Sequence, residues 1–155
     1  MTPREGLAHL AVLSPSNIKM GLGRVRLALD RLGNPQRSFA ALHIAGTNGK
    51  GSTCAIAASC LRLRYRTGLY TSPHLERPNE RIQLDGVEID DQTFGRRISE
   101  VLAVLGVDHE LTYFELATVV AFWHFAAEQV QVAVLETGLG GRLDAPTACV
   151  PSVTC

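Results

Sequence analysis

The sequence predicts an α/β protein with a mainly parallel sheet flanked by helices. Short apolar runs alternate with segments of helical periodicity along the 155 residues, a pattern typical of strands joined by crossover helices. One such run leads into the glycine-rich stretch His43 to Thr53, which precedes a helical segment. With 46% hydrophobic residues, the chain can bury one ordinary core, so we expect a single domain.

The expected elements follow from hydrophobic periodicity and from residues that begin or end helices. Gly33 to Pro35 ends the first helix, and Asp90 or Asp91 caps a later one. Asp85 and Gly86 form a strong hairpin signal between two short strands. In chain order, the prediction is helix 22–32, strand 39–45, helix 52–64, strand 68–71, strands 81–84 and 87–89, helix 90–105, helix 114–129, strand 131–136 and the beginning of a strand at 152–155.

Composition and charge exclude several classes of partner. Lys plus Arg equals Asp plus Glu, 15 each, so no broad basic field favours nucleic acid or an anionic membrane. No apolar run approaches the length of a membrane span. The N-terminus lacks the basic and apolar segments of a leader peptide, and we expect a cytoplasmic protein. The cysteines, at positions 54, 60, 149 and 155, form no short metal-type pair, so buried free thiols are the favoured interpretation over a disulfide or metal role.

The stretch His43 to Thr53 predicts a phosphate site. A buried strand, a glycine loop and a helix N-terminus together present unpaired amides and the positive end of the helix dipole to an anion. Lys50 adds a point charge that can follow the terminal phosphates, and Ser52 or Thr53 can place a hydroxyl on a magnesium ion. The spacing departs from the usual phosphate-loop pattern, since Gly51 separates Lys50 from Ser52. A glycine-rich turn without a ligand is therefore the alternative. The predicted nucleotide-binding residues are Gly46, Thr47, Asn48, Gly49, Lys50, Gly51, Ser52 and Thr53.

Four ordered motifs resemble those of folylpolyglutamate synthases and dihydrofolate synthases, the folate branch of the Mur-ligase-like ATP-dependent amide ligases. AGTNGKGST at 45–53 is similar to that family's nucleotide loop, in which the extra glycine is normal. GLYTSPHLERPNERIQLDG at 68–86 is similar to its second motif, and LTYFELAT at 111–118 to its pterin-side segment. VLETGLGGRLDA at 134–145 resembles its acidic strand end and glycine loop. The resemblance implies a Mur-ligase-like central domain; a peptidoglycan Mur ligase is the weaker alternative, because TYFE and SPHL favour the folate branch.

The resemblance also implies a magnesium site at the carboxyl edge of the sheet. Ser72 follows the strand at 68–71, and Glu136 ends the apolar run at 132–136, so both stand where the ligand sites of α/β sheets gather. A hydroxyl and a carboxylate suffice chemically, because magnesium keeps several waters and takes phosphate oxygens as well. From the residues alone, a Ser-Pro turn and a solvated or helix-facing glutamate are the alternatives.

A folate side is implied by the same resemblance. Tyr113 and Phe114 offer flat faces for a pterin ring, while Arg142 and Asp144 offer polar edges. Without the resemblance, Tyr113 and Phe114 are expected to be core residues at a helix start. The segment NIKMGLGRV at 17–25 is similar to another folate-contacting loop of the family.

The implied reaction is ATP-dependent amide formation. A carboxylate of dihydropteroate or folate attacks the terminal phosphate of ATP, which gives an acyl phosphate and ADP, and the amine of L-glutamate then displaces phosphate. Lys50, as the catalytic residue, and Mg²⁺ would neutralise charge on the transferred phosphoryl group. The family also has a C-terminal glutamate-binding domain, so residues 1–155 are expected to be the incomplete N-terminal ATP-binding domain of a monomeric ligase, inactive alone. A stand-alone ATP-binding module without ligase activity is the alternative.

Overall fold

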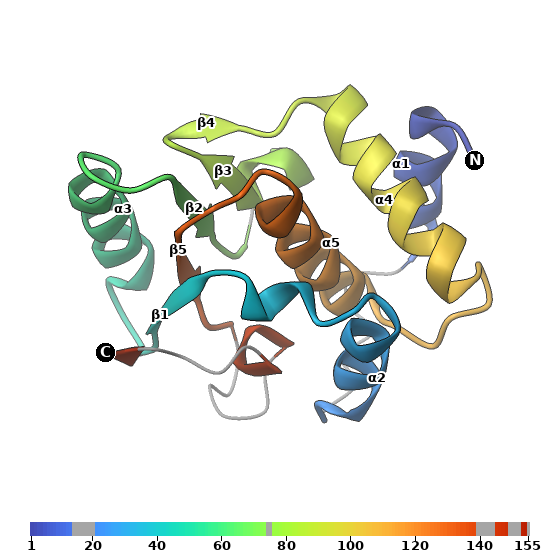
Figure 1. Cartoon of the computed structure of the whole chain (residues 1–155), viewed down its shortest axis with the longest axis horizontal. Helices are drawn as coiled ribbons and strands as arrows, with labels where there is room; N and C mark the ends of the chain where they lie inside the picture. The colour runs from blue at the N-terminus through green and yellow to red at the C-terminus, as the bar shows by residue number, and fades with distance from the viewer. Residues whose placement is uncertain (14–20, 74–75, 139–144, 149–152, 155) are drawn as a thin grey trace.

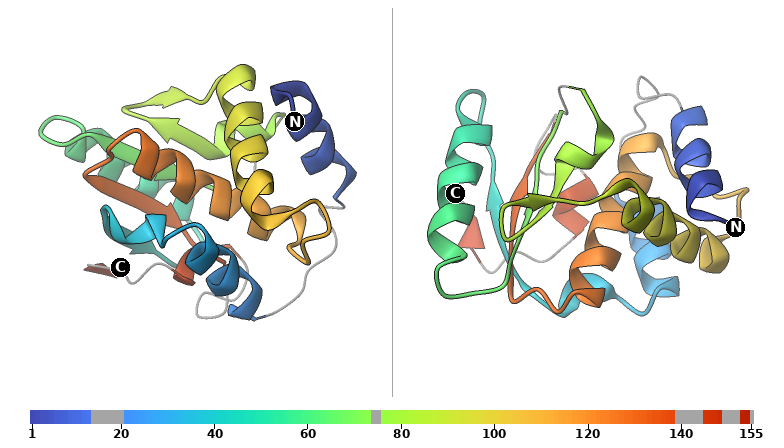
Figure 2. Two further views of the ribbon diagram at one scale, coloured as in Figure 1. Left: turned by 45° about the vertical axis from the view of Figure 1, so that its right-hand side comes forward. Right: turned by 90° about the horizontal axis from the view of Figure 1, so that it is seen from above.

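A computed structural model describes residues 1–13, 21–73, 76–138, 145–148 and 153–154, and it has a sheet as its middle layer (Figures 1 and 2). In chain order the elements are α1 (Pro3–Val12), α2 (Gly23–Arg31), η1 (Pro35–Arg37), β1 (Ala40–Ile44), α3 (Lys50–Leu61), β2 (Thr67–Tyr70), η2 (Pro78–Arg81), β3 (Ile82–Leu84), β4 (Val87–Glu88), α4 (Asp91–Leu105), α5 (Tyr113–Ala127), β5 (Val132–Glu136), η4 (Ala145–Ala148) and β6 (Val153–Thr154).

The sheet is mainly parallel, as predicted. Its strand order is β4-β3-β2-β5-β1-β6, in which β2, β5, β1 and β6 run parallel and the β3–β4 hairpin is antiparallel. Ile44 lies opposite Glu136 in the β1–β5 register, and Tyr70 lies opposite Leu135 in the β2–β5 register. The carboxyl ends of β1, β2 and β5 therefore meet at one edge of the sheet.

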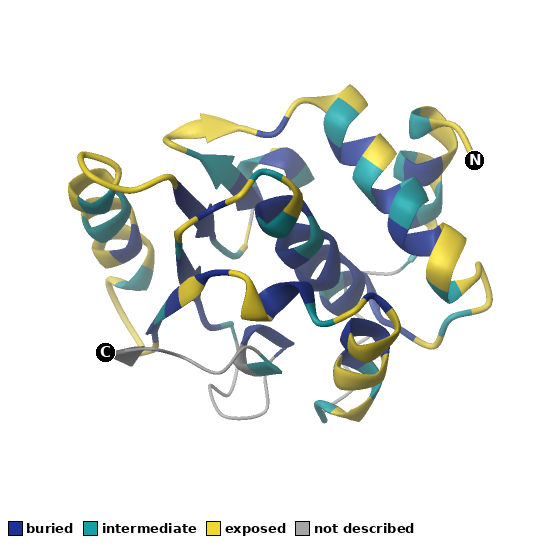
Figure 3. Cartoon of the chain, viewed as in Figure 1, coloured by how far each residue is buried: buried dark blue, intermediate teal, exposed yellow. Residues whose placement is uncertain are grey.

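Helices cover the two faces of the sheet unequally. Among the α-helices of the described residues, α3 lies on one face, and α1, α2, α4 and α5 lie on the other (Figure 2, right). Helix α5 is apolar around its whole circumference and is buried, because the sheet contacts one side of it and the other helices cover the rest (Figure 3). In contrast, α3 buries only a narrow stripe over Ile44, Leu69 and Val134. Among the described residues, none of the helices has both the length and the apolar character that crossing a membrane requires.

Local signals placed the hairpin and the later helix caps correctly. Asp85 and Gly86 form the turn between β3 and β4, with φ of 50° and 84°, the left-handed conformation that this dipeptide tolerates. Asp90 caps α4 by accepting a hydrogen bond from the backbone N–H of Thr93 at 2.8 Å. The boundaries of these elements follow from side chains next to them in the sequence.

The predicted start of the helix after the glycine loop was wrong. Helix α3 begins at Lys50 rather than at Ser52, because Gly49 adopts φ 75° as the capping residue and turns the chain directly into the helix. Lys50 and Gly51 therefore belong to the first helical turn and not to the loop.

Helix α1 was not predicted. Thr2 and Glu5 cap each other's backbone in a capping box, and Pro3 occupies the first turn, a start signal that is present in the sequence. The helix contacts α4 at two glycines: a Cβ on Gly95 would lie 2.0 Å from the carbonyl oxygen of Pro3, and one on Gly6 would lie 2.5 Å from that of Gly95.

Candidate functional site

The glycine loop lies at the carboxyl edge of the sheet, between β1 and α3. Gly46 has φ 154° and Gly49 has φ 75°, and no side chain caps the N-terminus of α3. The first-turn amides of α3 are therefore available to a ligand. The Lys50 ammonium folds back over the loop and donates to the carbonyl oxygen of Gly46 at 2.8 Å, while the Thr53 hydroxyl donates to the carbonyl oxygen of Gly49 at 2.9 Å. All eight predicted nucleotide-binding residues thus lie together around one exposed helix start.

The two predicted metal ligands lie side by side at the same edge. The backbone N–H of Ser72 donates to Oε2 of Glu136 at 3.1 Å, and Glu136 is only 5% exposed. Both the N–H and the hydroxyl of Thr137 donate to the carbonyl oxygen of Ile44, at 3.0 and 3.2 Å. This double contact fixes Glu136 beside the start of the glycine loop. The hydroxyl and carboxylate oxygens fit a hard cation such as magnesium. Waters and phosphate oxygens would complete the coordination of that cation.

Cys54, near the start of α3, lies in one buried cluster with Ile44 at the end of β1. Burial and the negative charge of Glu136 raise the pKa of its thiol to about 12, against opposition from the positive charge of Lys50. Both charged groups therefore act on the same buried thiol, which stays protonated and is no nucleophile. Cys60 is exposed, so the expectation of a buried thiol was wrong for this residue. Cys60 lies outside the narrow stripe of α3 that packs on the sheet.

The predicted aromatic pair begins α5, whose N-terminus lies at this edge. Thr112 and Glu115 form a capping box that fixes the helix start. Tyr113 is buried at 5% exposure, as the residues alone suggested, and burial raises the pKa of its phenol. Phe114 is half-buried, and its ring centroid lies 6.2 Å from that of Tyr70 on β2. Of the pair, Phe114 is the less buried residue.

An ion pair that the sequence did not reveal connects α2 to this helix start. Arg24 donates to both carboxylate oxygens of Glu115, at 3.2 and 2.7 Å, and the Glu115 side chain is only 5% exposed. The hydrogen bonds to Glu115 raise the pKa of Arg24 above its usual value. Such a bidentate contact is strong and directional. The visible signal was Glu115 three residues after Thr112, but nothing in the sequence identified Arg24 as its partner.

Arg81 is a second functional candidate that was missed. It was predicted to begin a strand but ends the short helix η2, and it is buried. Its guanidinium carbon lies 5.7 Å from the Tyr113 ring centroid and 5.6 Å from that of Phe114. Two further predicted residues, Arg142 and Asp144, lie outside the described part of the chain.

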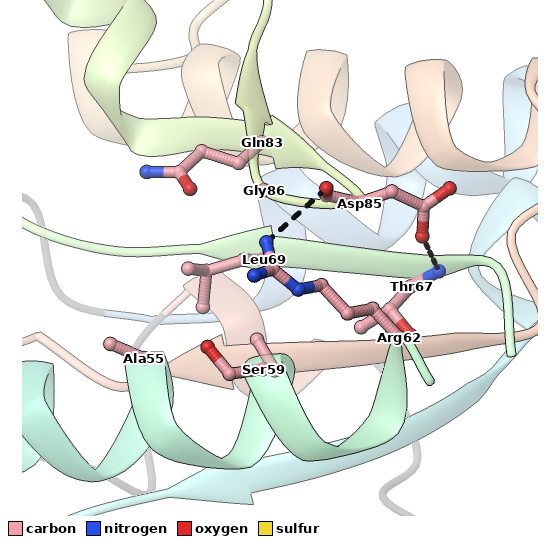
Figure 4. Close-up of a pocket in the computed structure, with 9 residues that line it drawn as sticks. Ala55, Ser59, Arg62, Thr67, Leu69, Gln83, Asp85 and Gly86 are labelled. Atoms are coloured by element: carbon pink, nitrogen blue, oxygen red, sulfur yellow. Dashed lines mark hydrogen bonds between the residues drawn. The ribbon is translucent and has the colours of Figure 1, made fainter. Parts of the chain in front are cut away.

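A separate hollow of about 130 Å³ lies between α3 and the β3–β4 hairpin (Figure 4). Thr67 lines it and begins β2, whereas Ser72 follows the other end of that strand. The side chain of Asp85 accepts from the backbone N–H of Thr67 at 2.8 Å, and Arg62 donates to the carbonyl oxygen of Asp85 at 3.5 Å. The hollow is therefore a packing gap at the amino edge of the sheet, distinct from the candidate site.

Together, the fold and the site define an α/β domain in which a glycine loop, an oxygen-donor pair and an aromatic pair share one sheet edge. No family model matches the chain. Individual relatives do match. The chain is 42% identical over 140 residues to the dihydrofolate synthase/folylpolyglutamate synthase of Escherichia coli, which covers 90% of the chain and 33% of the relative. It is 46% identical over 130 residues to a probable dihydrofolate synthetase of Schizosaccharomyces pombe, with 83% of the chain and 31% of the relative covered.

Solved structures give the same result. E. coli FolC in complex with DHPP and ADP matches with a TM-score of 0.88 and 38% identity over 99% of the chain and 37% of the neighbour. The bifunctional folylpolyglutamate synthase/dihydrofolate synthase of Yersinia pestis, complexed with AMPPNP and Mn ion, matches with a TM-score of 0.85 and 36% identity over 99% and 38%. Over most of its own length, the chain is thus homologous to dihydrofolate synthases and folylpolyglutamate synthases, which are Mur-ligase-like enzymes. It spans about a third of the length of the curated relatives it matches, 33% and 31%.

Proposed function

We propose that this chain is the ATP-binding part of a ligase that adds L-glutamate to dihydropteroate or reduced folates through an acyl phosphate. The observation that supports this most directly is the contact between Ser72 and Glu136 at 3.1 Å beside the loop that carries Lys50. This contact places oxygen ligands for a divalent cation beside the N-terminus of α3, whose uncapped amides can bind phosphate. Relatives with this sequence pattern are ligases of the same reaction class.

Lys50 is proposed to stabilise the phosphoryl group during its transfer. A ligand would replace the carbonyl oxygen of Gly46 as the partner of the Lys50 ammonium, and the first-turn amides of α3 would hold the remaining phosphate oxygens. Ser72 and Glu136 would hold Mg²⁺, which supplies positive charge to the phosphate oxygens. The Mn ion of the Yersinia pestis neighbour supports a divalent metal at such a site.

The folate side is proposed to lie at the head of α5. The half-buried ring of Phe114 offers a flat face for a pterin, and buried Tyr113 supports it from within the core. Arg142 and Asp144 remain proposed polar contacts. DHPP in the E. coli neighbour and folate in another neighbour, a complex of FPGS with AMPPCP and folate, support a pterin-bearing substrate.

The glutamate site is proposed to belong to a C-terminal domain of the protein, because this chain covers 33% of its E. coli relative. We further propose a monomer that works in the cytoplasm, where ATP is abundant and where the exposed free thiol of Cys60 stays reduced.

The test is incorporation of radiolabelled glutamate by the full-length gene product, with dihydropteroate and tetrahydrofolate as separate substrates. We expect amide formation that requires both ATP and Mg²⁺. ATP hydrolysis without amide formation would instead indicate a nucleotide-binding module. Glutamate transfer only to a peptidoglycan precursor would indicate a Mur-type ligase, and either result would overturn the proposal.

A further inference from the structure

Arg81 connects two parts of the candidate site that are distant in sequence. Its carbonyl oxygen accepts a hydrogen bond from the backbone N–H of Thr71 at 3.0 Å, directly before Ser72 on the metal side. Its side chain extends to the other part, where the guanidinium lies against Tyr113 and Phe114 at 5.7 and 5.6 Å from their ring centroids. One residue therefore joins the end of β2 to the head of α5.

The backbone that carries Arg81 is held firmly. The buried side-chain amide of Asn79 donates to the carbonyl oxygen of Ile89 at 2.8 Å and to a carboxylate oxygen of Asp91 at 2.9 Å. The carboxylate of Glu80 accepts from the backbone N–H of Arg77 at 2.7 Å. These contacts anchor η2 from both sides, and the burial of Arg81 holds its side chain against the rings.

The contact between Arg81 and the rings is suited to a planar cation. A guanidinium can lie against two aromatic rings at once and is more weakly hydrated than an ammonium, so it loses less on burial than lysine would. Phe114 is held from two directions, by Arg81 and by the ring of Tyr70 at 6.2 Å. The plane of the Phe114 ring, and hence of any flat ligand on it, depends on both neighbours.

We propose that Arg81 is a positioning residue for a flat heteroaromatic substrate: it sets the plane of Phe114 and keeps that ring in register with the strand end that carries Ser72. The inference rests on the proposed function, which identifies this substrate as a pteridine. Arg81 acts through the aromatic pair. Its loss should therefore weaken binding of the pteridine without weakening binding of Mg-ATP, which is held by the glycine loop.

The experiment compares Arg81→Met and Arg81→Lys with the unchanged full-length protein. The matched control is Arg77→Met, because Arg77 adjoins the same short helix but has a side chain 60% exposed that pairs with Glu88 on the surface. The KM for dihydropteroate is measured at saturating Mg-ATP, and the Kd for Mg-ATP is measured separately by calorimetry. The second measurement also reports whether each variant is folded.

We expect Arg81→Met to raise the KM for dihydropteroate about tenfold, and Arg81→Lys to raise it by about threefold because charge is kept but the planar contact is lost. The Kd for Mg-ATP should stay within about twofold in both variants, and Arg77→Met should change neither constant. If dihydropteroate KM stays unchanged in Arg81→Met, or if both constants rise together in Arg81→Lys, the inference is overturned while the proposed function stands. If the unchanged protein uses neither dihydropteroate nor tetrahydrofolate, both fail.

Discussion

Lys50 is a single charge whose position depends on the backbone around it. Gly49, in the left-handed region at φ 75°, turns the chain so that Lys50 begins α3 and its ammonium reaches back to Gly46 at 2.8 Å. That hydrogen bond is exposed, so it contributes little to stability. The charge is therefore available to a phosphate without cost to the fold.

Replacement of Lys50 by Ala should lower kcat for ATP-dependent amide formation by about 100-fold or more, because a preorganised charge on the transferred phosphoryl group is lost. Thermal unfolding should not change. The control is Arg64→Ala, which removes an exposed positive charge just beyond the other end of α3. Near-normal turnover in the Lys50 variant would remove Lys50 from the catalytic role.

Glu136→Gln should raise the Mg²⁺ concentration needed for half-maximal activity by about tenfold or more. The glutamine oxygen can still accept from the backbone N–H of Ser72, as Oε2 does at 3.1 Å, so the fold is retained while the charge is lost. A magnesium titration of both proteins measures the effect. An unchanged titration curve would count against Glu136 as a ligand.

Among the elements, α1 and α4 are joined by a contact that tolerates no side chain. A Cβ on Gly95 would lie 2.0 Å from the carbonyl oxygen of Pro3, and this neighbour is backbone, which cannot rotate away. Gly95→Ala should therefore lower the free energy of unfolding by about 2–3 kcal/mol and loosen α1. Gly23→Ala is the matched control: nothing lies within 4 Å of a Cβ there, and alanine in a helix should stabilise by about 0.5–1 kcal/mol. Urea unfolding of both variants measures the difference, and equal stabilities would contradict the predicted close contact.

A buried histidine makes the α4–α5 pair sensitive to pH. Burial, assisted by the positive charge of Arg97, lowers the pKa of His124 to about 4, against opposition from Glu128. Arg97 lies 3.4 Å from the ring and is itself held by Glu128 at 2.9 Å. The folded state keeps the ring neutral, whereas the unfolded chain takes up a proton below the ordinary value of 6.5, so stability is present above that pH and falls as the pH drops toward 4.

Between about pH 7 and about pH 5, we expect the free energy of unfolding to fall by roughly 1–2 kcal/mol from His124, after allowance for solvent screening. His109 adds to the same trend, because burial and then the charge of His9 lower its pKa. Urea unfolding at both pH values measures the loss, and His124→Gln should make it smaller. An equally steep loss in that variant would assign the pH dependence to other groups.

For the whole molecule, the chain spans about a third of its E. coli relative, 33%, yet holds the glycine loop, Ser72 and Glu136. Residues 1–155 alone should bind Mg-ATP weakly and should not join glutamate to a pteroate. Holding the amine against an acyl phosphate can supply about 7–11 kcal/mol of the barrier, and that role is proposed for the C-terminal domain.

We also expect this chain alone to be poorly soluble, because α3 and the segment after it leave Ile56 at 66% and Leu63 at 82% exposed. Expression of residues 1–155, thermal unfolding and a glutamate-incorporation assay test both expectations. Efficient amide formation by the purified 155-residue chain would refute the prediction of inactivity.

Features that depend on neighbouring residues could be predicted from the sequence. The glycine loop, the Asp85-Gly86 turn and the Asp90 cap are decided by backbone conformations and hydrogen bonds within a few residues, so their signals are local. Ser72 and Glu136 were placed at one edge because the carboxyl ends of parallel strands meet there. The resemblance to a known family then supplied the expected chemistry of these positions.

By itself, the sequence determined the α/β class, the glycine loop and which side chains stand at the strand ends. Only the tertiary structure decided which distant groups meet: Arg24 with Glu115, at 2.7 Å across 91 positions, and Arg81 with the two aromatic rings of α5. It also decided that Tyr113 is buried while Phe114 is only partly buried. Local propensity carries no information about these pairings, because they form only when the sheet brings segments that are far apart in sequence to one edge. Each buried polar or charged side chain then pairs with a group that lies next to it in the folded protein.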